Sequence, residues 1–127
     1  PIASILRTKY REYPEYHTSQ NNLEDVVTPK GLNGGYWAIR SSLELIERNK
    51  KFKVTVLGEP QMSKRDLYPT LSTRKINKQR NLMMNLISLC DGNTSVLNIA
   101  NRLNVPAWDL YDIIDKLKSN NLIVESN

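Results

Sequence analysis

The C-terminal part of the sequence carries three apolar stripes at helical spacing, each followed by a turn signal. The first stripe comprises Leu82, Met83, Leu86, Ile87 and Cys90, before Asp-Gly. The second follows "NTS", where Thr94 or Ser95 can cap a helix, and the third follows Pro106, a residue favoured in a first helical turn. A short apolar segment, "LIVE", ends the pattern. Three short helices, a tight turn at "LNVP" and a strand predict a winged helix-turn-helix over residues 74–127.

The N-terminal part has a different pattern. "IASILR" is typical of a buried strand, and the Pro-, Ser- and Asn-containing stretch after it is typical of a loop. Residues 36–49 have helical periodicity, and "FKVTVLG" alternates like a half-buried strand. Strand, loop, helix and strand over residues 1–60 predict a fragment of an α/β domain, joined by a connector at 61–73 to the winged helix.

Composition is that of an ordinary globular protein, with 39% hydrophobic and 24% charged residues. The most apolar stretch, residues 82–90, is far shorter than the roughly 20 residues of a membrane span. The single cysteine, Cys90, excludes an internal disulfide and is expected to be a buried free thiol. These features favour a cytoplasmic protein that is not inserted in a membrane.

The distribution of charge argues against DNA binding, although the net charge is +5. Residues 61–91 hold six Lys/Arg and two Asp/Glu, so the excess lies before the predicted reading helix. The exposed face of that helix should carry Asp109, Asp112 and Asp115, which phosphates would repel. No DNA-binding residue is therefore predicted, and the winged helix is expected to pack against its neighbour or bind a protein partner.

His17 is the only histidine and lies in "YPEYHTSQNN", among tyrosines. A lone histidine beside aromatic residues is usually structural. No catalytic residue can be assigned, because Cys90 lies in an apolar stripe and no nucleophile and base share a recognisable spacing. A catalytic zinc needs about three protein ligands, and His17 supplies only one.

Three separated segments, however, resemble one known family in the family's own order. These are "YREYPEYHTSQNNLEDVVTPKGL", "GEPQMSKRDLYPTLS" and "LISLCDGNTSVLNIANRLNVP". Together they resemble the C-terminal part of a bacterial aminopeptidase-like family, related to the co-catalytic zinc aminopeptidases and carrying an appended winged helix. The resemblance covers nearly the whole chain.

The resemblance implies that His17 is the last zinc ligand of a metal-dependent hydrolase. In such enzymes two zinc ions activate a bridging water and polarise the scissile carbonyl. The other ligands and the glutamate that activates the water would precede Pro1, which is not a methionine and suggests a boundary inside a longer chain. The chain alone is then expected to be inactive, with the rest of that domain as its partner. A sheet truncated in this way could also drive self-association through its edge.

Some positions depart from the family pattern, and alternatives stay open. Gln20, Asn21 and Asn22 stand where an acidic residue is usual, and Ser63 and Asp66 replace expected glycines. For Glu59, Lys64 and Arg65 a structural role in an ordered loop between the two units is favoured over a substrate role. One alternative is a non-enzymatic module that binds protein or, less readily, DNA. Another is a parent protein whose site binds a ligand without turnover.

Overall fold

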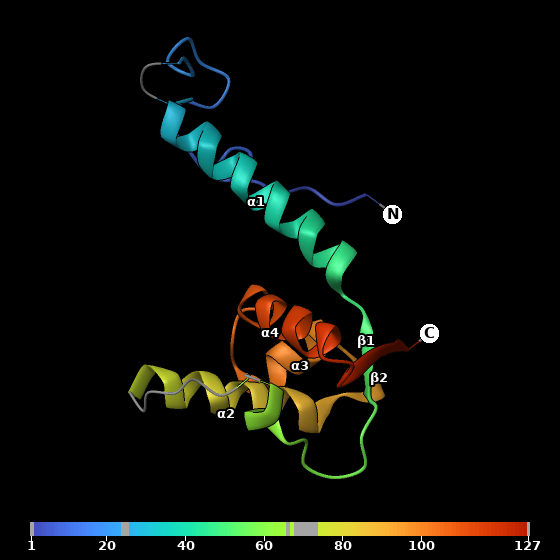
Figure 1. Ribbon diagram of the computed structural model, residues 1–127. Helices are drawn as coiled ribbons and strands as arrows, with labels where there is room; N and C mark the ends of the chain where they lie inside the picture. Colours follow the sequence, from blue (N-terminus) through green and yellow to red (C-terminus); the bar gives the residue numbers. More distant parts are fainter. Residues whose placement is uncertain (1, 24–25, 66, 68–73, 127) are drawn as a thin grey trace. The chain divides into compact units, whose positions relative to one another are not determined.

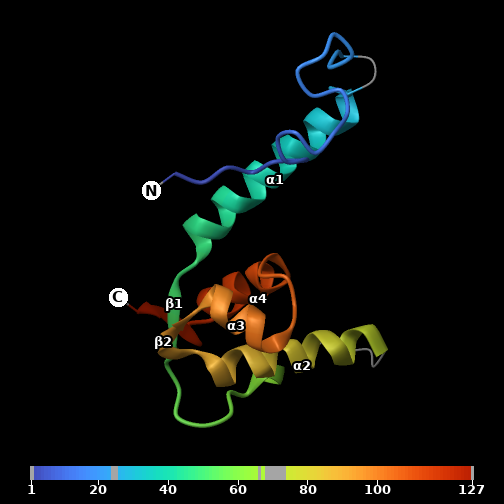
Figure 2. The ribbon, with the colours of Figure 1, turned by 180° about the vertical axis from the view of Figure 1, so that it is seen from behind.

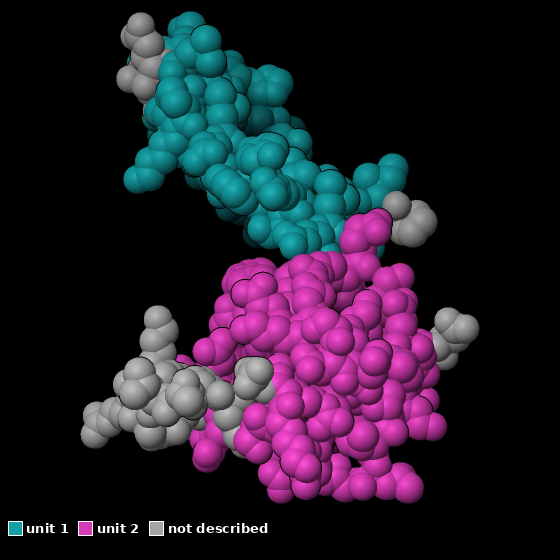
Figure 3. Space-filling view, viewed as in Figure 1, with its two compact units in different colours: residues 1–46 teal, residues 47–127 magenta. Residues whose placement is uncertain are grey.

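The chain forms two compact units, which span Pro1–Ile46 and Glu47–Asn127 (Figure 3). The computed structural model describes residues 2–23, 26–65, 67 and 74–126. No helix formed by these residues has the length and apolar character needed to cross a membrane.

The first unit consists of loops and most of helix α1, Pro29–Arg48. The helix begins seven residues before the predicted start at residue 36. Thr28 accepts a hydrogen bond from the Gly31 amide at 3.1 Å, and Pro29 occupies the first turn, a combination that favours a helix start. Gly34 and Gly35 interrupt the periodic pattern and hide this early start in the sequence. No residue of α1 is buried.

The predicted buried strand at "IASILR" is absent. Residues 2–6 have no regular secondary structure, and Ile2 and Ile5 are 100% and 51% exposed. A strand requires a neighbouring strand to satisfy its backbone N–H and C=O groups. No strand among the described residues pairs with this segment, so its apolar pattern is not sufficient to form one.

The second unit is a winged helix with a three-stranded antiparallel sheet in the order β2-β1-β3 (Figure 1). Its elements in chain order are β1 (Lys51–Val54), the 3₁₀ helix η1 (Met62–Arg65), α2 (Arg74–Leu89), β2 (Asp91–Ser95), α3 (Val96–Leu103), α4 (Trp108–Ser119) and β3 (Ile123–Ser126). The three predicted helices and the final strand are thus confirmed.

Strand β1 belongs to the winged helix, and this corrects its predicted place in the α/β fragment. It pairs with β3 through Lys51 with Ser126 and Val54 with Ile123, and with β2 through Lys51 with Ser95. The strand order places β1 between the other two strands, and both ribbon views show β1 beside β2 (Figures 1 and 2). The second compact unit accordingly begins at Glu47, and residues 61–65 lie within it instead of connecting two units. Most of the remaining predicted connector, 66 and 68–73, falls outside the described residues.

Strand β2 is too polar to be recognised in the sequence, and its first residue shapes it. The Asp91 carboxylate accepts hydrogen bonds from the Asn93 and Thr94 amides, each at 2.7 Å, and from the Thr94 hydroxyl at 2.9 Å. These bonds, led by that of the Thr94 amide, lower the pKa of Asp91. Gly92 is buried with a φ of 86°, a conformation that favours glycine.

The apolar stripes of α2, α3 and α4 meet in one core beside the sheet. Leu86, Ile99, Leu110 and Leu117 are 0% exposed, and Phe52 brings β1 into the same core. The turn at "LNVP" is confirmed: Asn104 has a left-handed conformation with a φ of 54° and ends α3. This core holds the helix-turn-helix in place.

Candidate functional site

His17 lies in a turn of the first unit, with an exposed side chain and a backbone φ of 58°. Left-handed conformations are uncommon for residues other than glycine and are a reason to consider function. The residues on either side of His17 are joined by two hydrogen bonds. The Glu15 carbonyl accepts them from the amide and the hydroxyl of Thr18, at 3.1 and 2.8 Å. Thr18, which follows His17, therefore stabilises this turn.

Three tyrosines form a cluster beside His17, and one of them contacts its ring. The Tyr16 ring lies 4.2 Å from the His17 ring between centroids, at an interplanar angle of 50°. Tyr10 and Tyr13 contact Tyr16 at 6.1 and 5.6 Å. Among the described residues the imidazole has this ring contact and no hydrogen bond to the protein. Within the described part of the chain, neither ring nitrogen is therefore occupied by a hydrogen bond to the protein.

The described residues do not complete a metal site around His17. They contain no group of three or more His, Cys, Asp or Glu side chains that could hold a metal ion. A zinc ion needs more protein ligands than one imidazole. His17 could therefore hold zinc only together with residues from outside this set, and the present residues alone do not fit the ion.

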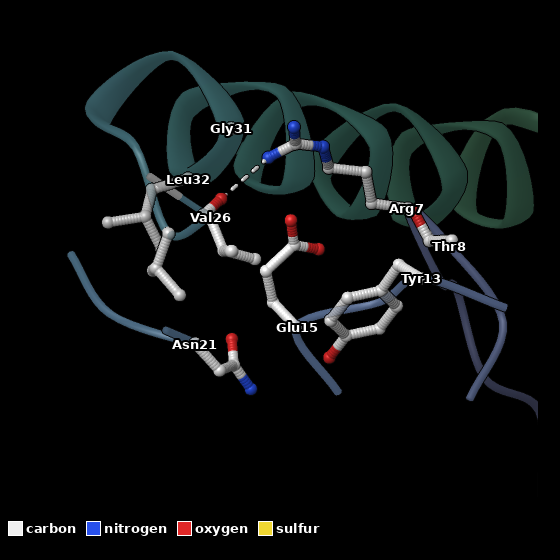
Figure 4. Close-up of a pocket in the computed structure, with 9 residues that line it drawn as sticks. Arg7, Thr8, Tyr13, Glu15, Asn21, Val26, Gly31 and Leu32 are labelled. Carbon is white, nitrogen blue, oxygen red and sulfur yellow. Dashed lines mark hydrogen bonds between the residues drawn. The ribbon is translucent and has the colours of Figure 1, made fainter. Parts of the chain in front are cut away.

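The first unit also contains a cavity of about 490 Å³ between the loop over residues 7–27 and the start of α1 (Figure 4). Its polar lining includes Arg7, Tyr13, Glu15 and Asn21. The Arg7 guanidinium donates a hydrogen bond to the Val26 carbonyl at 3.2 Å and lies so close to Gly31 that a β-carbon there would collide with it. The Glu15 carboxylate points toward the same space. A guanidinium, a carboxylate and a phenol together suit a polar ligand.

This cavity was not predicted from the sequence, and His17 is not among its lining residues. Tyr13 and Glu15 lie in "YPEYHTSQNN" together with His17, but Arg7 is the last residue of the apolar segment "IASILR". Its contact with Val26 spans 19 positions. Local patterns carry no signal for a contact of that separation.

The "GEPQ" segment has a structural role within the second unit. Pro60 and Met62 are buried, and Met62 is 1% exposed. Arg65 donates a hydrogen bond to the Gln61 carbonyl at 3.2 Å, and the Leu67 amide donates to the Met62 carbonyl at 3.2 Å. Glu59 and Lys64 are exposed. Residues 59–65 lie within the second unit and therefore do not bridge the two units.

Helix α4 presents the acidic face that the sequence predicted. Asp109, Asp112 and Asp115 are all exposed, and Asp115 forms an ion pair with Arg48. Arg48 also lies over the Tyr111 ring, 4.3 Å from its centroid. In the position where a winged helix places its reading helix, this surface is unfavourable to phosphate.

Cys90 is a buried free thiol, as predicted. Burial, aided by the neighbouring Asp91 charge, raises the pKa of the Cys90 thiol from 9.0 to about 11. A thiol with so high a pKa is a poor nucleophile near neutral pH. Cys90 is therefore part of the core and not of a reactive site.

Comparisons with known proteins match both units. A search of curated proteins gave no match. A crystal structure described as a "putative peptidase from Clostridium acetobutylicum" superposes with a TM-score of 0.72 at 24% identity. The match covers 89% of this chain but 24% of the other, so this chain spans about a quarter of that protein's length. At this identity the likeness shows a shared fold.

Two sequence families account for almost the whole chain. Residues 1–49 match a domain of unknown function, DUF4910. Residues 50–125, more than half of the chain, match a winged helix-turn-helix family, and this range begins next to β1, where the second compact unit also begins. On the agreement of fold and sequence, the protein belongs to this winged helix-turn-helix family.

Proposed function

We propose that this chain is the C-terminal portion of a zinc-dependent aminopeptidase-like hydrolase. The observation that carries the proposal is the fold shared with a protein described as a peptidase, over 89% of this chain. The motif resemblance around His17 and the "GEPQ" segment supports the same parentage. We also propose that the protein is located in the cytoplasm.

In this proposal His17 is one zinc ligand of the longer protein. Its support is the exposed imidazole, the left-handed turn and the absence of a protein hydrogen bond to either ring nitrogen among the described residues. The remaining ligands would come from outside this chain. The 127-residue chain alone is then inactive, because its described residues do not assemble a metal site.

The departures near His17 bear on activity and not on the ligand itself. Gln20 and Asn21 are exposed in the turn, and Asn22 keeps an interaction of its own within the fold. An amide can replace the hydrogen bonds of an acid but not its charge. The alternative is accordingly that the parent protein binds peptide without hydrolysing it, and measuring both binding and product release distinguishes the two.

A direct test uses the longer protein with short peptides that have a free amino terminus. The proposal predicts release of the N-terminal residue, and loss of that release when the amino terminus is acetylated or zinc is chelated. Binding of the free peptide without any product would replace hydrolysis by the ligand-binding alternative. Hydrolysis that resists chelation and is unaffected by His17→Ala would contradict the proposal.

For the winged helix we propose a packing or protein-interaction role and not DNA binding. The supporting observation is the exposed row of Asp109, Asp112 and Asp115 on α4. Affinity for random-sequence duplex should be negligible at low salt and unchanged at high salt. Binding that weakens steeply with salt would indicate phosphate contacts and would contradict this assignment.

A further inference from the structure

A groove on the second unit lies between α2 and α4 and has no part in the proposed peptidase site. Lys78, Gln79 and Leu82 form one side, and Trp108, Asp109, Asp112 and Ile113 form the other. Its volume is about 400 Å³. Trp108 is 57% exposed at the start of α4. We call this surface the α2/α4 groove.

Trp108 is a costly residue to leave in water. Exposing half of so large an aromatic ring forgoes hydrophobic stabilisation, and tryptophan is enriched among the residues that dominate protein interfaces. Leu82 is only partly buried in the same groove and adds apolar surface beside it. Ile113, on the α4 side of the groove, is 2% exposed. The groove therefore offers an apolar centre with a tryptophan anchor.

The two sides of the groove carry opposite charge. Lys78 is exposed on the α2 side, and Asp109 and Asp112 are exposed on the α4 side. No ion pair among the described residues joins any of these three side chains. Asp109 and Asp112 are three positions apart on one helix, a spacing at which like charges repel. Both sides would gain from an opposite charge supplied from outside.

We propose that the α2/α4 groove is a self-complementary interface between two copies of this chain. A two-fold axis running along the groove would place α2 of each copy over α4 of the other. Lys78 would then face Asp109 and Asp112 of the second copy, and Trp108 would pack over its Leu82. Such pairing, in which the same patch serves both partners, is the usual form of a symmetric dimer.

A second copy suits this groove better than nucleic acid does. Duplex phosphate would meet Asp109 and Asp112 and be repelled. A purely basic peptide would satisfy the α4 side but oppose Lys78 on the α2 side. A surface of the same charge pattern, turned by the two-fold axis, satisfies both sides at once.

Concentration dependence of the oligomeric state is the first test. Sedimentation of the full chain should show a monomer converting to a dimer as concentration rises. The chain has two tryptophans, Trp37 and Trp108, so Trp37→Phe leaves Trp108 as the single reporter. Its emission should shift to shorter wavelength with the same concentration dependence, as the indole leaves water. A chain that stays monomeric at every accessible concentration overturns the proposal.

Charge exchange then identifies the surface. Asp112→Lys should weaken the dimer by about a hundredfold, because the substitution occurs twice in a symmetric interface and each repulsive pair costs about tenfold in affinity. Lys78→Asp should act similarly. The double variant Lys78→Asp with Asp112→Lys should restore the dimer, since opposite charges face each other again.

Matched controls separate this effect from net charge and from folding. Glu59→Lys and Lys64→Asp make the same changes of charge at exposed positions outside the groove, and they should leave the dimer unchanged. Thermal unfolding of each variant checks that the winged helix is intact. A dimer that survives both single substitutions, or a double variant that fails to restore it while remaining folded, overturns the proposal.

Discussion

Ser95 ends β2 and caps α3 with one side chain. Its backbone is extended, with φ −75° and ψ 157°, and its hydroxyl accepts a hydrogen bond from the Asn98 amide at 3.4 Å. The sequence allowed either Thr94 or Ser95 in this position. Ser95 is the cap, and the Thr94 hydroxyl instead donates a hydrogen bond to the Asp91 carboxylate. The preference is a property of the folded turn that residue types alone do not reveal.

Replacement of Ser95 by alanine should lower the free energy of unfolding of the winged helix by about 1 kcal/mol, since an N-terminal amide of α3 loses its acceptor. Chemical denaturation measures the change. Ser88→Ala is the matched control, because that hydroxyl only donates to the Asn85 carbonyl within α2. Equal stability of Ser95→Ala and Ser88→Ala would show that the cap contributes nothing.

Cys90 should make the stability of the winged helix depend on alkaline pH. Its pKa rises from 9.0 to about 11 in the folded protein, so above pH 9 the unfolded chain loses the thiol proton before the folded one does. The stability difference between the wild type and Cys90→Ala should therefore fall as pH rises from 9 to 11 and then level off. A difference that is constant over this range would contradict the buried, protonated thiol.

At the scale of elements, the helices could be predicted and the strand partners could not. The stripes of α2, α3 and α4 repeat within a few residues, and most of their members are buried in the core, although Leu82 is only partly buried and Leu97 is 42% exposed. Strand pairing joins distant segments. β2 is formed by "DGNTS", residues with little strand preference, because β1 lies beside it. "IASILR" has the preference but no described partner.

Phe52 tests the assignment of β1 to the winged helix. The side chain is 3% exposed, although it lies about 40 residues before β2 in the sequence. Phe52→Ala should destabilise the second unit by about 3–5 kcal/mol, the cost of removing a buried aromatic ring. Denaturation followed by the helical signal measures this. Val124→Ala, at a half-exposed position of β3, is the control and should cost far less. A small effect of Phe52→Ala would mean that β1 is dispensable to this unit.

At the scale of the whole molecule, the two units differ in how many side chains they bury. The second has a core of buried side chains from all three of its α-helices and its sheet. The described residues of the first include no fully buried side chain, and Trp37, Leu43 and Ile46 of α1 are each at least half exposed. Surface of this kind is typical of a segment that packs against another part of a protein. It agrees with the proposal that this chain is the C-terminal portion of a longer protein.

Only part of the candidate site could be predicted from the sequence. His17 could be singled out because the chain has one histidine and because its neighbours resemble a known motif. The Arg7 and Glu15 cavity could not, since the residues that line it lie as far apart in the sequence as Arg7 and Leu32.

Zinc content of the longer protein tests the central claim most directly. The wild type and His17→Ala would be purified in parallel, with Tyr10→Phe as a control that alters the same aromatic cluster without touching the imidazole. Elemental analysis should find bound zinc in the wild type and in Tyr10→Phe, and clearly less in a folded His17→Ala variant. Zinc stoichiometry that is unchanged by the loss of His17 would contradict the account.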